Sequence, residues 1–305
     1  MFLLSLLATS FAATEAPPEA SVASGEPIAA KWDLTEGTEH RWKVETRIAF
    51  PGHAWLVADR NEQVRVPHLS LQAVLDCTVA EAWNDRGRLA CEISDAALMG
   101  KTFPGDHGRL QVVLDEVDAK LTGAPVGITM KDNGRITDIE VTPHRVSGFV
   151  NRRTRQTDQF LRMLVIRSIA PLDFKVPDAG FAVGESWMND DTRIIDLPVY
   201  WGSMGDARLV HAAAPVDDAR VLVRSEGRVT MRTGGLFLKG DIEGYSVFDH
   251  ERGTLTEAYW HTDSDATPTA GPFGRPYRSV SRIHALAPDE VVDLPETKEV
   301  LPAES

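Results

Sequence analysis

The stretch of residues 142–171, TPHRVSGFVNRRTRQTDQFLRMLVIRSIAP, is the only long segment of this 305-residue chain with the apolar period of a helix. Thr142-Pro143 suits a helix start, because the hydroxyl can cap a free amide and proline fits the first turn, and Pro171 suits a stop. We therefore expect one long central helix at about residues 144–170. Its apolar side chains form one stripe, made of Val146, Phe149, Val150, Phe160, Leu161 and Leu164.

The same segment is strongly basic, although the whole chain has a net charge of −13. Four of its arginines fall on the side opposite the apolar stripe: Arg145, Arg152, Arg155 and Arg162. One interpretation is a face that binds anionic head groups, envelope polymers or an acidic protein. The other, which we favour, is a solvent-exposed face partly paired with carboxylates, since that is the ordinary role of charge on a helix surface.

Short strands account for most of the remaining sequence. Residues 41–50 alternate between apolar and charged side chains, and residues 110–114 have the composition of another short strand. Residues 219–232 and 236–248 form the clearest hairpin, and a turn at Thr233-Gly234 would place Ser225 opposite Ile242. Strands on both sides of one helix predict a β-dominated α+β fold: a large curved antiparallel sheet, half-barrel or two-layer, packed on that helix.

The two ends of the chain differ in composition from this body. Residues 1–12 carry a short apolar run followed by Ser10 and Ala12, which is typical of a secretory signal peptide. Residues 13–30 are rich in Pro, Ala and Glu and are expected to be a disordered linker, and residues 288–305 an acidic disordered tail. Residues 31–287 then form a single domain. Because no later run is long enough to span a bilayer, we expect an exported protein, periplasmic or secreted.

Two cysteines, Cys77 and Cys91, lie on the apolar sides of two strands that face each other in a hairpin. An oxidising compartment would favour a disulfide between them. A tight turn at Asp85-Arg86 would leave them about three positions out of register, so the bond requires a longer loop or a bulge. The alternative is a pair of buried thiols.

Familiar catalytic and cofactor motifs are absent from the sequence. It has no nucleophile elbow, zinc-protease motif, phosphate-binding glycine loop or dinucleotide fingerprint, and its nine histidines show no metal-pair spacing. We expect no cofactor and no metal, and the acidic balance argues against nucleic-acid binding. An enzyme would need a site built from distant strands, for which Glu257, His261 and Asp263 are the best available residues. We therefore name no catalytic residue.

Aromatic residues supply the remaining site prediction. Trp187 and Trp260, with Phe149, Phe160 and Leu164 of the helix, could line a cleft for an apolar ligand between helix and sheet. The alternative is ordinary core packing, because aromatic side chains contribute most to burial.

Two short motifs carry a resemblance to known proteins: Val-Gly-Glu-Ser-Trp at 183–187 and Asp-His-Glu-Arg-Gly at 249–253. With the strand–helix–strand layout, they resemble exported bacterial β-rich proteins of unknown function. The layout is also similar to the half-barrel of periplasmic lipoprotein-carrier and lipid-binding proteins, in which a curved sheet wraps a helix. The resemblance implies that fold and a lipid-like ligand, but assigns no residue a role.

Three hypotheses follow. The first is a non-enzymatic envelope module that holds an apolar or lipid-like ligand between sheet and helix; the second is a structural or protein-interaction module of the envelope with a filled core. The third and least favoured is an enzyme. The interior between the apolar stripe and the sheet separates the first two, because a carrier needs space there and a scaffold does not.

Overall fold

A computed structural model of the chain describes residues 27–49, 68–100, 108–142, 152–173, 175–192, 204–233, 236–268 and 275–294. The expected signal peptide, most of the linker and the last part of the acidic tail lie outside these residues. So do Arg145, Val146, Phe149 and Val150 of the expected helix.

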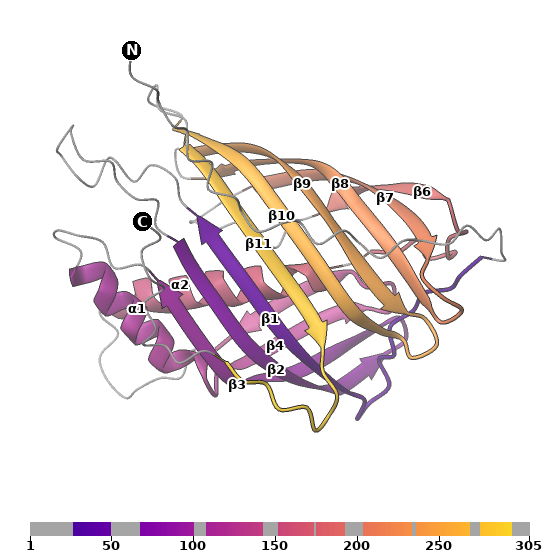
Figure 1. Ribbon diagram of the computed structural model, residues 1–305, viewed down its shortest axis with the longest axis horizontal. Helices are drawn as coiled ribbons and strands as arrows, with labels where there is room; N and C mark the ends of the chain where they lie inside the picture. Colours follow the sequence, from indigo (N-terminus) through magenta and orange to yellow (C-terminus); the bar gives the residue numbers. More distant parts are fainter. Residues whose placement is uncertain are drawn as a thin grey trace, which may run out of the picture.

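One antiparallel sheet contains all eleven described strands, and Figure 1 shows that it is strongly curved. Its order is β5-β4-β3-β2-β1-β11-β10-β9-β8-β7-β6, so two meanders meet at the central pair β1–β11. The strands are β1 (Glu39–Ala49), β2 (His68–Trp83), β3 (Arg86–Gly100), β4 (Pro125–Lys131), β5 (Ile136–Val141), β6 (Ser186–Thr192), β7 (Met204–Pro215), β8 (Arg220–Thr233), β9 (Leu236–Asp249), β10 (Thr254–Pro268) and β11 (Arg275–Ala285). The predicted curved antiparallel sheet is therefore confirmed.

The prediction of one long central helix is wrong. The described chain has two α-helices, α1 (Gly108–Leu121) and α2 (Arg152–Ile169), and a 3₁₀ turn, η1 (Ala170–Leu172). The strand expected at residues 110–114 belongs to α1. Val117 and Leu121, which continue its apolar pattern at a helical spacing of four, are both buried, and this longer pattern decides the conformation.

α2 crosses the inner face of the sheet. It follows edge strand β5 and precedes edge strand β6 in the chain, and it packs on β5, β1 and β11, while η1 packs on β10 and β11. Leu161 and Leu164 of the predicted stripe are fully buried there, with Val165. Figure 1 shows α2 inside the curve of the sheet. The helix therefore fills the centre of the inner face, as a core element does.

Residues 27–38, which we call the strap, close one end of the curved sheet. Their backbone amides bond to two hairpin turns and to β2: Trp32 to the carbonyl of Asp132 (2.7 Å), Asp33 to that of Gly253 (2.8 Å) and Gly37 to that of Val79 (2.9 Å). The Trp32 ring packs edge-on against Trp42 and Phe248, with centroids 6.1 and 5.6 Å apart. This end of the inner face is therefore apolar and aromatic.

Hairpin turns lie one residue away from where we expected them. β2 and β3 turn at Asn84-Asp85, where Asn84 adopts φ 38°, and a bulge at Ala80 adds a further shift, so Cys77 lies directly opposite Cys91. The two sulfurs are bonded, 2.00 Å apart. In β8 and β9, Thr233 pairs with Leu236, and Ser225 therefore faces Gly244 rather than the expected Ile242.

Candidate functional site

One unbroken row of paired residues crosses the inner face from β1 to β6. We call it the inner row: Thr46, Ser281, Trp260, Gly244, Ser225, His211 and Trp187. Each is the direct cross-strand neighbour of the next. The hydroxyl of Ser281 donates to the Arg167 carbonyl of α2 (3.2 Å), which identifies this side of the sheet as the inner one. The row unites strands that are far apart in the sequence.

α2 occupies the β1–β11 side of the row. Ser281 lies 3.2 Å from the Thr46 hydroxyl as well as from the Arg167 carbonyl, so both hydroxyls hold the helix in place. The Arg167 side chain is also buried, and Arg167 interacts with other groups of the protein. This part of the row is structural.

Trp260 lies in the row between Ser281 and Gly244. It is 4% exposed, and within the described part of the chain its indole Nε1 has no hydrogen-bond partner. The ring leans over the neighbouring strand, because a Cβ on Gly244 would lie 2.8 Å from Trp260 Cδ1. Gly244 therefore makes room for the indole, and a buried donor faces the inner side of β9 unused.

His211 of β7 lies in the row between Ser225 and Trp187. Its Nδ1 lies 2.8 Å from the Ser225 hydroxyl, and its ring stacks on Trp187 at a centroid distance of 5.4 Å. Burial, together with the nearby charge of Lys175, lowers the pKa of His211 to about 4. The imidazole is consequently neutral at physiological pH. Trp187 donates its own Nε1 to the Lys175 carbonyl (3.2 Å) and so is fixed in place.

The side chains on the two sides of the inner row differ in size and polarity. On the strap side lie Ala258, Ser246, Val223 and Ala213, and beyond them the aromatic end with Trp32, Trp42 and Phe248. On the other side lie Ser279, Thr262, Ile242 and Leu209, all buried. The inner face is therefore aromatic near the strap and a mixture of small, hydroxyl-bearing and aliphatic side chains at and beyond Trp260.

The structure brings two of the predicted ligand-binding residues, Trp187 and Trp260, into the same row. Leu164 lies in the filled interface between α2 and the sheet. Phe160 belongs to α2, but its side chain and that of Phe149 are outside the description. The sequence search missed Gly244, Ser225 and His211, because no local pattern connects them; only the pairing of three strands does.

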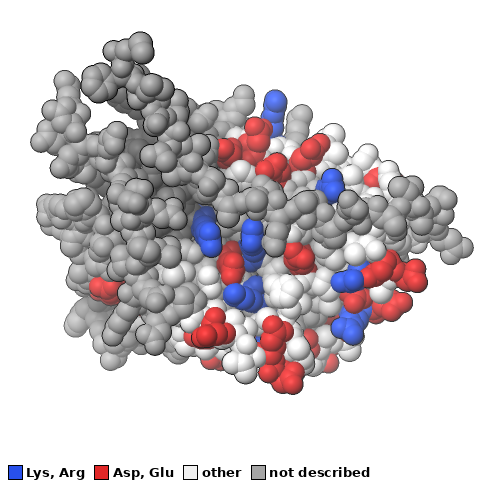
Figure 2. All heavy atoms as spheres, viewed as in Figure 1, with Lys and Arg blue, Asp and Glu red and all other residues white. Residues whose placement is uncertain are grey.

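Of the arginines predicted to form an anion-binding face, Arg162 is exposed and donates its Nε to the carbonyl of Val141 at the end of β5, 3.1 Å away. Arg152 and Arg155 lie in α2, with side chains outside the description. Figure 2 shows acidic and basic side chains mixed over the described part of the face in view. Elsewhere in the described chain, Arg41 and Asp76 form an ion pair (2.9 Å).

The three residues named as candidates for an enzyme site, Glu257, His261 and Asp263, lie on the outer face of the sheet, opposite the inner row. Glu257 accepts a hydrogen bond from the Tyr245 hydroxyl (2.5 Å), and His261 Nδ1 lies 3.1 Å from a Glu243 carboxylate oxygen. Asp263 shares this face of β10, and no described cleft includes the three residues. Among the described residues, no three His, Cys, Asp or Glu side chains gather as metal ligands would.

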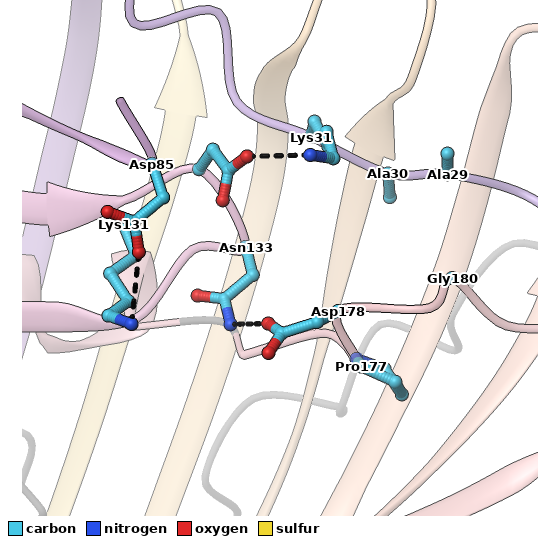
Figure 3. A pocket seen from close by; sticks show the side chains of 10 residues that line it. Ala29, Ala30, Lys31, Asp85, Lys131, Asn133, Pro177, Asp178 and Gly180 are labelled. Atoms are coloured by element: carbon cyan, nitrogen blue, oxygen red, sulfur yellow. Dashed lines mark hydrogen bonds and ion pairs between the residues drawn. The ribbon is translucent and has the colours of Figure 1, made fainter. Parts of the chain in front are cut away.

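A separate polar hollow of about 210 Å³ lies beside the strap (Figure 3). Its charged groups are paired: Lys31 with Asp132 (2.8 Å), and Lys131 with Asp85 (3.2 Å). The Asn133 amide donates to a further lining carboxylate, that of Asp178 (2.6 Å). We interpret this hollow as a structural contact in which the strap pairs with the β4–β5 turn and that turn pairs with the β2–β3 turn, because its polar groups already satisfy one another.

Comparison with known proteins finds no matching family model and no matching curated protein. A solved structure described as "Lipid-protein interactions in lipovitellin" is similar with a TM-score of 0.49 and 11% identity, over 84% of this chain and 26% of that one. A second, "Asymmetric conductivity of engineered proteins", has a TM-score of 0.21 and 9% identity, over 82% of this chain and all of the other. This chain therefore spans about a quarter of the lipovitellin chain. No helix within the described ranges is long and apolar enough to cross a membrane.

Proposed function

We propose that this protein is a non-enzymatic binding module that holds an apolar or lipid-like ligand against the inner face of β8, β9 and β10. One observation carries the proposal: the buried indole N–H of Trp260, which has no partner among the described residues, stands among small side chains. Ligand sites are mostly apolar surfaces with a few well-placed polar groups, and this part of the sheet has that composition.

The ligand position differs from the one expected between the apolar stripe and the sheet. Leu161, Leu164 and Val165 are buried against the central strands, so α2 leaves that part of the interior filled. The proposed site lies further along the sheet, where the inner face presents Gly244, Ser246 and Ala258.

We also propose that the protein acts in the cell envelope or outside the cell after export. The apolar leader expected at residues 1–12 supports this, as does the Cys77–Cys91 disulfide, because such bonds persist in oxidising compartments.

Filling the proposed site tests the function. Ser246→Leu adds volume to the inner face of β9, and Ala73→Leu adds similar volume to β2 in the hydrophobic core. Both side chains are 1% exposed, so both changes should destabilise by about 1–3 kcal/mol, as overpacking does. Ser246→Leu should also abolish lipid binding, because the added side chain occupies the proposed site, and Ala73→Leu should leave binding intact. Urea unfolding and native mass spectrometry with added lipid measure both effects.

A structural or interaction module is the second possibility, and the filled interface beneath α2 favours it. Edge strand β6 also exposes Met188 (58%) directly opposite Val210 (38%) on β7, which offers a partner some apolar surface. If no lipid binds to the native protein, or if Ser246→Leu binds lipid as well as Ala73→Leu does, this second function replaces the first.

A further inference from the structure

We infer that residues 27–34 of the strap form a hinged lid. The lid turns about residues 35–38 while the sheet stays folded, and in doing so it uncovers Trp42 and Phe248 at the aromatic end of the inner face. The inference goes beyond the proposed function, because the opening requires no ligand. It gives the buried inner face a path to solvent.

The lid is attached to turns and connecting segments rather than to a strand of the sheet. Ile28 exchanges two backbone hydrogen bonds (2.8 and 3.1 Å) with Phe181, which lies in the segment before β6, and this bridge is isolated. The amides of Trp32 and Asp33 each donate to one carbonyl, in the β4–β5 and β9–β10 turns. Central strand β1, by contrast, is paired on both sides, with β2 and β11. The lid can therefore detach at a much smaller cost than a central strand.

The packing between the lid and the rest of the molecule is incomplete. The polar hollow of about 210 Å³ is lined on one side by Ala29, Ala30 and Lys31 of the lid and on the other by hairpin turns (Figure 3). The ion pair of Lys31 with Asp132 crosses it, and the Lys31 side chain is 61% exposed, so the pair contributes little stability. Because protein interiors are otherwise closely packed, the hollow marks a place where the lid makes few close contacts.

Two polar atoms buried beneath the lid, Trp32 Nε1 and His40 Nε2, have no hydrogen-bond partner within the described chain. The two rings lie edge-on with centroids 6.0 Å apart, so both atoms belong to the contact between the lid and β1. A buried polar atom without a partner costs free energy that hydration restores. Opening the lid recovers this cost, which offsets part of the burial of Trp32 and Leu34 that keeps the lid closed.

Residues 35–38 have the properties of a hinge. Residues 35–37 are exposed, and Gly37 has a φ of 87° with no atom within 4 Å of the position that a Cβ would take. On the side of the sheet, Gly37 and Thr38 are tied to Val79 of β2 by two backbone hydrogen bonds of 2.9 Å. This side is therefore fixed, and a change of backbone angles at residues 35–37 moves the lid without disturbing β1.

Native-state hydrogen exchange of the full-length protein, without ligand, tests the lid. The amides of Trp32 and Asp33 report its closure, because their hydrogen bonds exist only when the lid is shut, and the amides of the central pair β1–β11 report unfolding of the sheet. We expect the lid amides to be protected at least about tenfold less than the central amides, and to depend less on urea, as a local opening does.

A matched pair of glycine substitutions tests where the lid is seated. Gly180 and Gly184 have nearly the same φ, 80° and 84°, but a Cβ on Gly180 would lie 2.7 Å from the Ile28 carbonyl oxygen, whereas one on Gly184 would have no atom within 4 Å. Gly180→Ala should lower the protection of the Trp32 and Asp33 amides by roughly 5- to 100-fold relative to Gly184→Ala, as steric overlap does. The central amides should be equally protected in both variants.

The wild-type measurement alone can overturn the inference. Lid amides that share the protection and the urea dependence of the β1–β11 amides would show that the strap opens only when the sheet unfolds. Equal protection of the lid amides in Gly180→Ala and Gly184→Ala would also overturn it, because the lid would then not close against Gly180. Neither result depends on lipid binding, so the lid and the proposed function fail separately.

Discussion

Replacing Asp173 with asparagine should stabilise this protein, and by more at pH 8 than at pH 5. Asp173 follows η1, and its carboxylate accepts a hydrogen bond from the backbone amide of Ile136, 2.9 Å away. Burial raises the pKa of this carboxyl from 3.8 to about 7, against the opposing effects of the Ile136 amide and the charges of Arg135 and Lys175. Asparagine retains an acceptor oxygen for Ile136 but cannot acquire the charge.

The sign and size follow from proton linkage. Because the folded pKa lies above the unfolded one, the stability due to protonated Asp173 is fully present only below pH 3.8 and is lost progressively as the pH rises from there through 7. Between pH 5 and pH 8 the loss is at most about 3 kcal/mol, and less because the residue keeps part of its surface. His211 acts in the opposite sense: its folded pKa of about 4 lies below 6.5, so its contribution grows by about 2 kcal/mol over the same interval.

The opposite pH effects of Asp173 and His211 on stability nearly cancel in the wild type. The Asp173→Asn variant should therefore show the pH effect of His211 alone. Urea unfolding at pH 5 and pH 8, with the disulfide intact, should show a nearly level stability for wild type and a rise of about 2 kcal/mol with pH for Asp173→Asn. Asp217→Asn is the control, because the hydrogen bond from Arg220 lowers the pKa of Asp217 and the group stays ionised throughout. If Asp173→Asn shows the same pH dependence as wild type, the carboxyl is not held protonated and the reasoning fails.

Two further predictions concern the core. Leu164→Ala should lower the free energy of unfolding by about 2–5 kcal/mol, because the side chain is fully buried between α2 and the sheet, whereas exposed Met188→Ala should change it by less than about 0.5 kcal/mol; equal effects in urea unfolding would contradict the filled interface. Replacing Cys77 and Cys91 together by alanine should cost about 3 kcal/mol, since the bond closes a loop between residues 14 apart, and an unchanged thermal midpoint would contradict this.

The candidate site was only partly predictable. Trp187 and Trp260 could be named from composition, because buried aromatic residues in a strand-rich chain are natural ligand contacts. Their arrangement could not, because His211 and Ser225 reach Trp260 only through the pairing of β7, β8, β9 and β10. Each pairing depends on the position of a turn, which no residue of the site encodes.

The alternating pattern by itself determined which side chains face the interior. Moving a turn by one residue changes the pairing by two positions and preserves the face, so Ser225 remained an inner residue although its partner is Gly244 instead of Ile242. Partners, helix boundaries and sheet closure were decided only by the tertiary structure. The pair β1–β11 joins Thr46 to Ser281 across most of the chain, and contacts at such separation depend on the packing of the whole sheet around α2 rather than on any local period.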